Sequence, residues 1–280
     1  MAAPIVVRTV ADLRALVAGW RAEGLRVGLV PTMGALHAGH VSLVETARRS
    51  ADRVIVSIFV NPTQFAPNDD FAKYPRTFQS DLDVLSEVGT EAVYAPEVPT
   101  MYPPGAATTV SLTGPATAGL EDVSRPFHFA GVATIVAKLL IQAGPDVAVF
   151  GEKDFQQLAV IRRMAADLDL PVEIIGGATV RDADGLALSS RNRYLSPEER
   201  ATAPVLHRTM LGVAKALGDG LPPAEALAEG RAAITAAGFD LDYLELRAAD
   251  DLGSPRPGVP WRLLVAARLG ATRLIDNIAV

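Results

Sequence analysis

Residues 26–40 have the sequence Arg26-Val-Gly-Leu-Val-Pro-Thr-Met-Gly-Ala-Leu-His-Ala-Gly-His40. The apolar run Val27–Val30 predicts a buried strand, and the turn after it leads into an amphipathic stretch, Val41–Arg49, that predicts a helix. The start of a helix has unpaired backbone N–H groups and a partial positive charge, so it suits an anion, above all a phosphate. Because His37 and His40 are three residues apart, their rings are expected near one face of the first turn. The stretch therefore predicts a phosphate-binding strand, loop and helix.

The two histidines have other interpretations. A histidine pair can ligate a metal, but zinc needs a third protein ligand and usually a fourth. Beyond this pair the sequence has only His128 and His207, and it has no cysteine, so metal ligation is disfavoured. A structural or solvated role for the histidines stays open on this segment alone.

The composition is that of an ordinary globular protein. The chain has 280 residues, of which 49% are apolar and 21% charged, enough for a sizeable core and close to the length at which chains divide into two domains. Its net charge of -6 disfavours binding to nucleic acid or to an anionic membrane. No apolar run approaches about 18 residues, and the N-terminal residues do not resemble a signal peptide, so we expect a cytoplasmic protein. The absence of cysteine excludes disulfides and an enzyme-bound thioester.

Strands and helices alternate through the first part of the chain. Continuous apolar runs, typical of strands buried on both faces of a parallel sheet, occur at Arg26–Val30, Arg53–Val60, Ala92–Ala95, Val147–Phe150 and Val172–Ile175. Helical patterns between them occur at Val41–Arg49, Phe78–Val88, Val132–Ala143 and Phe155–Leu168. This alternation predicts an α/β fold with a doubly wound, Rossmann-like parallel sheet. Ligands of such sheets bind beyond the carboxyl ends of the strands.

Two further regions differ in character. Residues 96–126, rich in proline, glycine and threonine, predict a long excursion with a short strand at Thr108–Leu112, and this excursion suits a lid or an oligomer contact. After Gly176-Gly177 the pattern predicts two helices and then three strands, at Pro197–Leu217, Pro223–Ala237, Asp242–Arg247, Arg262–Ala267 and Thr272–Ala279. We therefore expect a Rossmann-like domain over residues 1–178 and a smaller α+β domain over residues 179–280.

Polar side chains that suit a ligand follow two of the predicted strands. Asn61 and Gln64 come after the second strand, where their amides suit hydroxyls and carboxylates, although Asn-Pro is also a common turn. Lys153 stands at the predicted start of a helix, where a cation is unfavourable unless an anion shares the site. Asp154 beside it can serve as the N-cap. We favour a ligand role for Lys153.

A polar loop follows a predicted hairpin. Asp184-Gly185 is a tight-turn signal, so Thr179–Leu188 predicts a hairpin. The next side chains carry hydroxyl and guanidinium groups: Ser189, Ser190, Arg191 and Arg193. Such groups bind phosphate oxygens, while an exposed basic loop before a helix is the alternative. Because the sequence has no Walker loop and no Gly-x-Gly-x-x-Gly fingerprint, binding by histidines and a second basic loop favours attack at the α-phosphate of a nucleotide.

The chain resembles the pantoate–β-alanine ligase (pantothenate synthetase) family, within the superfamily of nucleotidyltransferases that share a His-x-Gly-His motif. The most specific blocks are Pro-Thr-Met-Gly-Ala-Leu-His-Ala-Gly-His (31–40), Phe-Gly-Glu-Lys-Asp-Phe-Gln-Gln-Leu (150–158) and Asp-Gly-Leu-Ala-Leu-Ser-Ser-Arg-Asn-Arg-Tyr-Leu (184–195). Others match at 57–65, 74–77, 128–132 and 264–270. The resemblance implies that ATP and (R)-pantoate give pantoyl adenylate and pyrophosphate, and that β-alanine then displaces AMP to give pantothenate.

The resemblance also implies the residues of the site. It assigns catalytic roles to His37, His40, Lys153 and Arg191, and we expect these to stabilise charge rather than to require proton transfer from His40. It assigns Gln64 and Gln157 to pantoate, with Gln64 near β-alanine as well. The implied ATP contacts are Met33, Gly34, Ala35, Leu36, His37, Ala38, Gly39, His40, Gly151, Glu152, Lys153, Asp154, Val180, Leu188, Ser189, Ser190 and Arg191.

The resemblance further implies Mg²⁺, a homodimer, and a C-terminal domain that acts as a lid over the ATP site. Asp81 is the expected protein ligand of Mg²⁺, although Ser80 precedes it where some members carry an acid. Two alternatives remain: a nucleotidyltransferase that joins AMP to a phosphorylated substrate, and a silent nucleotide-binding scaffold. The neutral amides of Gln64 and Gln157 disfavour the first, and the intact cationic set disfavours the second.

Overall fold

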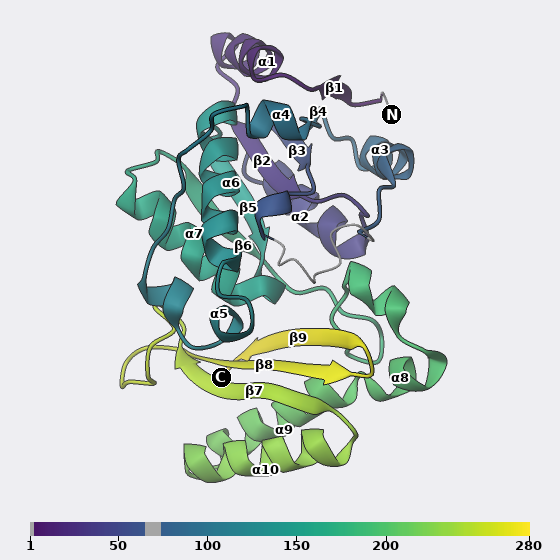
Figure 1. Cartoon of the computed structure of the whole chain (residues 1–280), viewed down its shortest axis with the longest axis vertical. Coiled ribbons are helices and arrows are strands. Elements are labelled where there is room, and N and C mark those ends of the chain that lie inside the picture. Colours follow the sequence, from purple (N-terminus) through teal and green to yellow (C-terminus); the bar gives the residue numbers. More distant parts are fainter. Residues whose placement is uncertain (1–2, 65–73) are drawn as a thin grey trace. The chain divides into compact units, whose positions relative to one another are not determined.

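The computed structural model describes residues 3–64 and 74–280. The chain divides into two compact units, shown in Figure 1. Unit 1 comprises residues 1–152 and 160–178, and unit 2 comprises residues 153–159 and 179–280. The break after Ala178 coincides with the expected boundary, whereas the short segment 153–159 groups with unit 2.

The described residues of unit 1 form a six-stranded sheet in the order β1-β4-β3-β2-β5-β6. Its strands are β1 (Ile5–Val7), β2 (Val27–Thr32), β3 (Arg53–Ile58), β4 (Ala92–Tyr94), β5 (Val147–Gly151) and β6 (Glu173–Gly177). All neighbouring strands are parallel. From β2 the chain proceeds to β3 and β4 on one side, and then continues at β5 on the other side of β2. The strand order therefore reverses between β2 and β5, which is where doubly wound sheets bind ligands. The predicted fold class is confirmed.

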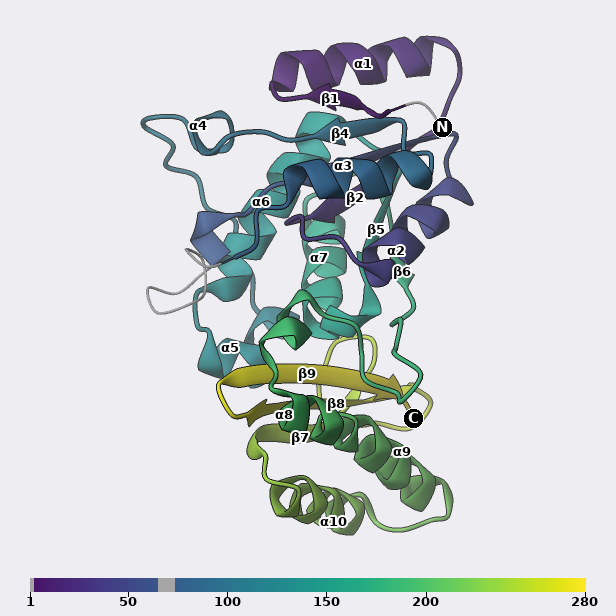
Figure 2. The same cartoon turned by 90° about the vertical axis from the view of Figure 1, so that its right-hand side faces the viewer.

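Helices cover both faces of this sheet. Unit 1 contains α1 (Val10–Ala22), α2 (Ala38–Arg48), α3 (Phe78–Glu87), α6 (His128–Ala143) and most of α7 (Phe155–Asp167). Figures 1 and 2 show α2 and α3 on one side of the sheet, and α6 and α7 on the other. Side chains alternate along each strand. In β3, Val54 and Val56 share a core cluster with Leu43 of α2 and Leu85 of α3. Ile55 lies between them in sequence, so its side chain points to the opposite face of the sheet, and it is also fully buried.

The excursion over residues 96–126 differs from the expectation. It contains α4 (Val98–Met101), a 3₁₀ turn η3 (Gly114–Thr117) and α5 (Glu121–Ser124). The strand expected at Thr108–Leu112 is wrong: within the described residues this segment has no strand partner. Instead, the Val110 N–H donates to Thr134 Oγ1 of α6 at 2.9 Å. A side-chain hydroxyl thus takes the hydrogen bond that a neighbouring strand would have accepted.

The described part of unit 2 has an antiparallel sheet of three strands, β7 (Asp240–Ala248), β8 (Trp261–Leu269) and β9 (Thr272–Ala279). Two helices, α9 (Val205–Gly218) and α10 (Pro223–Ala236), bury Met210 and Ile234 against Leu244 of β7. The single helix expected over Pro197–Leu217 is wrong. It is divided into α8 (Pro197–Thr202) and α9, because Pro204 lacks the N–H that a continuous helix needs.

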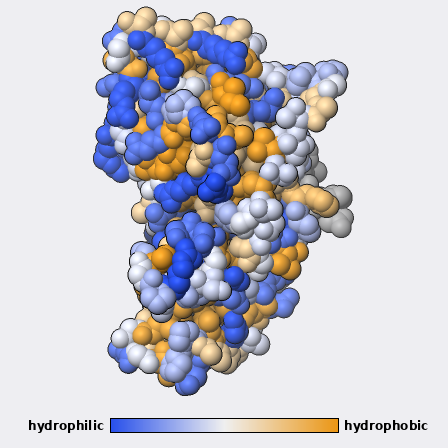
Figure 3. Space-filling model, turned by 90° about the vertical axis from the view of Figure 1, so that its left-hand side faces the viewer, coloured by the Kyte–Doolittle hydropathy of each residue, from blue (hydrophilic) through white to orange (hydrophobic). Residues whose placement is uncertain are grey.

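The surface is mixed in character. Figure 3 shows hydrophobic residues scattered among hydrophilic ones on one face of the molecule. Among the large apolar side chains that are exposed in the described residues, Phe127 (83%) and Val123 (70%) are the most accessible. In the described residues, no helix is both long enough and apolar enough to span a membrane.

Candidate active site

The two histidines after β2 form a cap on helix α2. His37 is the N-cap residue, and its Nδ1 accepts the Gly39 N–H at 3.1 Å. The Nδ1 atom of His40 accepts the N–H of His37 at 3.3 Å, and the two ring centroids are 4.1 Å apart. This is a capping box in which imidazoles replace the usual hydroxyl and carboxylate. The rings therefore meet at the helix start as expected. The N–H groups of His37 and Gly39, which we expected to be unpaired, instead donate to these rings.

A buried carboxylate holds the loop before these histidines. Gly34 and Ala35 have positive φ angles of 80° and 52°, a conformation that costs a residue other than glycine about 1–3 kcal/mol. Asp81 of α3 accepts the Ala35 N–H at 3.0 Å and the Leu36 N–H at 2.8 Å, and the Thr77 hydroxyl at 3.2 Å. Its exposed fraction is 2%. These contacts assign to Asp81 the role of fixing the loop, whereas the family resemblance implied metal ligation for this residue.

A turn rich in amides follows β3. It is the 3₁₀ turn η1 (Pro62–Gln64), preceded by the buried Asn61. Asn61 Nδ2 donates to Gln64 Oε1 at 3.2 Å, and Gln64 Nε2 donates to the sulfur of Met33 at 3.0 Å. The turn after β3 is thereby joined to the loop after β2. The structure thus brings together Gln64 and Met33, which the family resemblance assigned to different substrates.

Helix α6 packs closely against the same turn. A Cβ atom on Gly131 would lie 2.4 Å from the carbonyl oxygen of Thr63, so this approach requires glycine. The Gly131 carbonyl in turn accepts a hydrogen bond from Asn61 Nδ2 at 3.2 Å. The helix therefore fixes the position of the amide turn through its backbone.

Three side chains from the excursion and the start of α6 complete the support of this turn. The Gln64 carbonyl accepts hydrogen bonds from His128 Nδ1 at 3.0 Å and from Arg125 at 3.2 Å. The Tyr102 hydroxyl donates to Asn61 Oδ1 at 2.8 Å. Burial raises the pKa of Tyr102 above its ordinary value, although hydrogen bonds with Thr63 and Asn61 oppose this, so the phenol remains a donor at neutral pH. Sequence reasoning missed Tyr102, because this contact spans 41 residues.

Lys153 lies in a short turn after β5. This 3₁₀ turn, η4 (Glu152–Asp154), leads directly into α7. The Lys153 side chain is 20% exposed, and its ammonium is 3.8 Å from Asp154 Oδ1. The backbone carbonyl of Lys153 accepts a hydrogen bond from Asn277 Nδ2 at 2.8 Å. Gln157 is partly buried in the first turn of α7.

The predicted hairpin and the loop after it are present in unit 2. The Leu188 N–H donates to the Val180 carbonyl at 2.9 Å, and Arg181 pairs with Ala187 in an antiparallel bridge. Ser189 then caps the 3₁₀ helix η5 (Ser190–Tyr194), because its Oγ accepts the Arg191 N–H at 3.2 Å. The hairpin prediction is confirmed, and the hydroxyl and guanidinium groups follow it directly.

All the expected site residues lie in the described part of the chain. Those in unit 1 are Met33, Gly34, Ala35, Leu36, His37, Ala38, Gly39, His40, Gln64, Asp81, Gly151 and Glu152. Those in unit 2 are Lys153, Asp154, Gln157, Val180, Leu188, Ser189, Ser190 and Arg191. The loop after β2 and the turn after β3 form one hydrogen-bonded group in unit 1, whereas the supports of Lys153 and of the Ser189–Arg191 loop lie in unit 2.

The fold and these groups define an α/β enzyme of the doubly wound class, with imidazole, amide and ammonium side chains after its strands. The chain belongs to the pantoate–β-alanine ligase family, whose model matches residues 5–279. It is 58% identical over 280 residues to the pantothenate synthetase of Rhodopseudomonas palustris, with 99% of each chain covered. It is therefore a ligase that condenses pantoate with β-alanine in an ATP-dependent reaction.

Two solved structures of relatives share this fold. The pantothenate synthetase of Thermus thermophilus has a TM-score of 0.91 and 49% identity, with 98% of each chain covered. The pantoate–β-alanine ligase of Francisella tularensis, solved in complex with beta-gamma ATP and β-alanine, has a TM-score of 0.81 and 32% identity. That comparison covers 99% of this chain and 98% of the relative.

Proposed function

We propose that the condensation proceeds in two steps through pantoyl adenylate. A carboxylate oxygen of pantoate attacks the α-phosphorus of ATP, the bond from that phosphorus to the bridging oxygen breaks, and pyrophosphate leaves. The amine of β-alanine then attacks the acyl carbon, the bond to the AMP oxygen breaks, and the nitrogen loses a proton. Activation is needed because a carboxylate has only oxide as its leaving group, whereas the adenylate releases AMP.

The observation that carries this proposal is the order of the strands. β2 and β5 are neighbouring parallel strands, and parallel strands have their carboxyl ends at one edge of the sheet. The loop that ends at His37 and His40 follows β2 directly, and Lys153 comes two residues after the end of β5. An anionic substrate at this switch point would meet an imidazole pair after one strand and an ammonium group after the other.

Each residue then has a role in the proposed reaction. His40, Lys153 and Arg191 neutralise the charge that develops on the α-phosphate, and His37 contacts the phosphates. Gln64 and Gln157 bind pantoate, and Gln64 also receives β-alanine. The remaining residues of the loop after β2, the Lys153 turn and the segment Val180–Arg191 contact ATP. The ATP and β-alanine complex of the Francisella relative supports these two substrates.

Unit 2 is proposed to act as a lid over the nucleotide. Pantoyl adenylate is a mixed anhydride that water would hydrolyse, so the enzyme must exclude water until the amine arrives. A unit that brings Ser189, Ser190 and Arg191 to the nucleotide would bind its phosphates and would also exclude water.

Mg²⁺ is proposed to enter with the nucleotide. In the described residues, no three histidine, cysteine or acidic side chains gather where they could hold a metal ion. Both oxygens of Asp81 already accept loop N–H groups. These residues do not fit a protein cage, so Mg²⁺ would be held mainly by ATP phosphates and water. Asp81 as a metal ligand stays a prediction, and no step here depends on it.

A homodimer in the cytoplasm is the proposed state of the enzyme. The family resemblance implies this state, and the exposed Val123 and Phe127 of unit 1 are apolar side chains that a second copy would cover. Sedimentation velocity should give twice the chain mass of 29.5 kDa. A monomer at micromolar concentration would contradict the dimer and leave the chemistry untouched.

Pyrophosphate release tests the proposed function. With ATP and pantoate alone, we expect a burst of pyrophosphate that approaches one equivalent per active site. Addition of β-alanine should convert this burst into steady turnover with AMP and pantothenate as products. If pyrophosphate release does not depend on pantoate, the adenylate proposal is wrong.

A further inference from the structure

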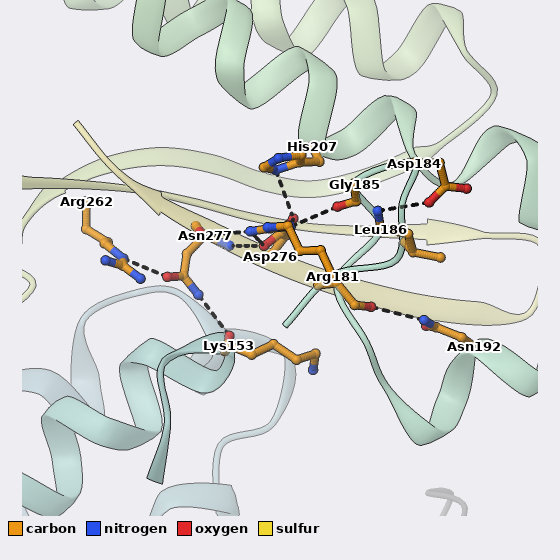
Figure 4. A network of polar contacts seen from close by, with 11 residues as sticks. Lys153, Arg181, Asp184, Gly185, Leu186, Asn192, His207, Arg262, Asp276 and Asn277 are labelled. Carbon is orange, nitrogen blue, oxygen red and sulfur yellow. Dashed lines mark hydrogen bonds and ion pairs between the residues drawn. The ribbon is translucent and has the colours of Figure 1, made fainter. Parts of the chain in front are cut away.

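Two adjacent residues of β9 reach different parts of the proposed ATP site. Asp276 and Asn277 are 6% and 2% exposed. Because successive residues of a strand point to opposite faces of the sheet, the two side chains reach different partners. Figure 4 shows Asn277 directed toward the Lys153 turn and Asp276 directed toward Arg181.

Asn277 supports Lys153 through its backbone. Its Nδ2 donates to the Lys153 carbonyl at 2.8 Å, while its Oδ1 accepts a hydrogen bond from Arg262 Nε at 2.6 Å. The contact with Arg262 fixes the orientation of the amide, so the donor faces Lys153. The Arg262 guanidinium also lies 4.2 Å from the ring centroid of Phe155, two residues after Lys153. Strand β9 and Arg262 thus hold the start of α7 at two points.

Asp276 supports the hairpin that leads to the Ser189–Arg191 loop. It accepts two hydrogen bonds from Arg181, at 2.6 and 2.8 Å, in a partly buried bidentate pair. Arg181 also donates to the Gly185 carbonyl at 3.1 Å, across the turn of the hairpin. At the other end, Asn192 Nδ2 donates to the Ala187 carbonyl at 3.0 Å. Hydrogen bonds therefore connect the residue after Arg191, through the hairpin and Asp276, to β9.

We propose that Asp276 and Asn277 are positioning residues for ATP, which hold the Lys153 turn and the Ser189–Arg191 loop in one fixed arrangement before the nucleotide binds. Groups already aimed at a developing charge need no reorganisation during the reaction. The inference rests on the proposed function, because it requires Lys153 and Arg191 to act on ATP. Asn277 acts through the main chain of Lys153, and Asp276 acts through Arg181.

The substitution Asn277→Asp tests the contact with Lys153. The carboxylate keeps the shape of the side chain and the acceptor for Arg262, but it cannot donate to the Lys153 carbonyl. We expect kcat/KM for ATP, measured by pantoate-dependent pyrophosphate release, to fall about tenfold, the order expected for one lost hydrogen bond. The KM for β-alanine should remain unchanged. Asp242→Asn is the matched control, because it removes the Arg273–Asp242 ion pair of 2.6 Å from the same sheet.

A double-mutant cycle with Lys153→Ala separates the possible results. If Asn277 acts through Lys153, Asn277→Asp should lower kcat/KM for ATP by less than about twofold in the Lys153→Ala background. An equal fall in both backgrounds, or no fall in either, overturns the positioning role. If Lys153→Ala alone has no effect on adenylation, the proposed function of Lys153 fails, and the positioning role fails with it.

Two further measurements complete the test. The melting temperature of each variant is measured beside its KM for ATP. If Asn277 has a purely structural role, Asn277→Asp will lower the melting temperature but leave the KM for ATP equal to that of the control Asp242→Asn. Asp276→Asn in the wild-type and Arg191→Ala backgrounds applies the same cycle to the hairpin. Additive effects there would overturn the role of Asp276.

Discussion

The two proposed phosphate-binding regions are held in place by different means. In unit 1, His37 and His40 cap their own helix through contacts between residues two and three apart in the sequence. In unit 2, Lys153 and the hairpin before Arg191 depend on Asn277 and Asp276, which are 124 and 95 residues distant from their partners Lys153 and Arg181. The helix cap in unit 1 is thus set by local sequence, although the loop before it is also held by Asp81 of α3, whereas the arrangement in unit 2 exists only after the C-terminal sheet has formed. Substitutions should therefore affect the two regions differently.

The largest effect should come from Lys153→Ala. Loss of one group that stabilises transition-state charge costs about 2.7–4 kcal/mol, so adenylation should slow by roughly 100- to 1000-fold. Rapid-quench measurement of pyrophosphate release checks this. Lys215→Ala is the control, because that side chain is 78% exposed and pairs locally with Asp219. An adenylation rate within about twofold of wild type would place Lys153 away from the reacting phosphate.

Asp81→Asn should have the next largest effect, and it tests a long-range support of the unit 1 loop. The amide of asparagine has one oxygen and one NH₂ group in place of the two carboxylate oxygens. Its NH₂ would therefore face one of the two loop N–H groups, and that hydrogen bond would be lost. We expect a loss of about 1.5–3 kcal/mol in the free energy of unfolding, measured by urea denaturation, together with a higher KM for ATP. Asp83→Asn is the control on the same helix, where the carboxylate accepts an exposed hydrogen bond from Gln79. Equal effects of the two substitutions would contradict the assigned role.

Gly131→Ala tests the contact between α6 and the amide turn. The new Cβ would meet the Thr63 carbonyl at 2.4 Å, and such overpacking costs about 1–3 kcal/mol. Because the turn carries Gln64, the KM for pantoate should rise as well. Gly212→Ala in α9 provides the opposite case, since nothing lies within 4 Å of its Cβ position. That change should stabilise the protein by about 0.5–1 kcal/mol, and a stabilising Gly131→Ala would refute the close approach.

The smallest expected effect is a pH dependence that arises from His207 in unit 2. Burial lowers the pKa of His207, the charge of Arg181 lowers it further, and Asp276 opposes both. Between this lowered pKa and the unfolded value of about 6.5, the unfolded chain binds more protons. Stability should therefore fall as the pH drops below about 6.5, and the loss should be complete below the folded pKa. Thermal melts from neutral to acidic pH should show a smaller decline in this range for His207→Gln than for wild type.

Much of the fold could be predicted, because the central strands are continuous apolar runs. The runs at β2, β3 and β5 are buried over most of their length, and burial is what makes a strand apolar throughout. Strand β1 was missed because it has only three residues at the edge of the sheet, two of them exposed. The helix α1 after it was also missed. The expected strand at Thr108–Leu112 failed because a side chain of α6 takes its hydrogen bond.

The candidate site divides in the same way. The sequence could place His37, His40 and Lys153 after a strand and beside a helix start, and the structure has them there. Tyr102, Asp276 and Asn277 could not, because their partners are distant in the sequence and any of them would suit an ordinary surface. Asp81 was expected from the family resemblance as a metal ligand. Its contacts with the loop N–H groups could be seen only in the fold.

The cap at the start of α2 determines the tautomer of both His37 and His40. Each Nδ1 accepts a backbone N–H, so the proton of each neutral ring is on Nε2. In this form a ring can donate from Nε2 to a phosphate oxygen. Protonation at Nδ1 would remove the acceptor that closes the end of the helix. In the proposed reaction, any proton exchange by His37 or His40 would thus be confined to Nε2, unless the helix start opens.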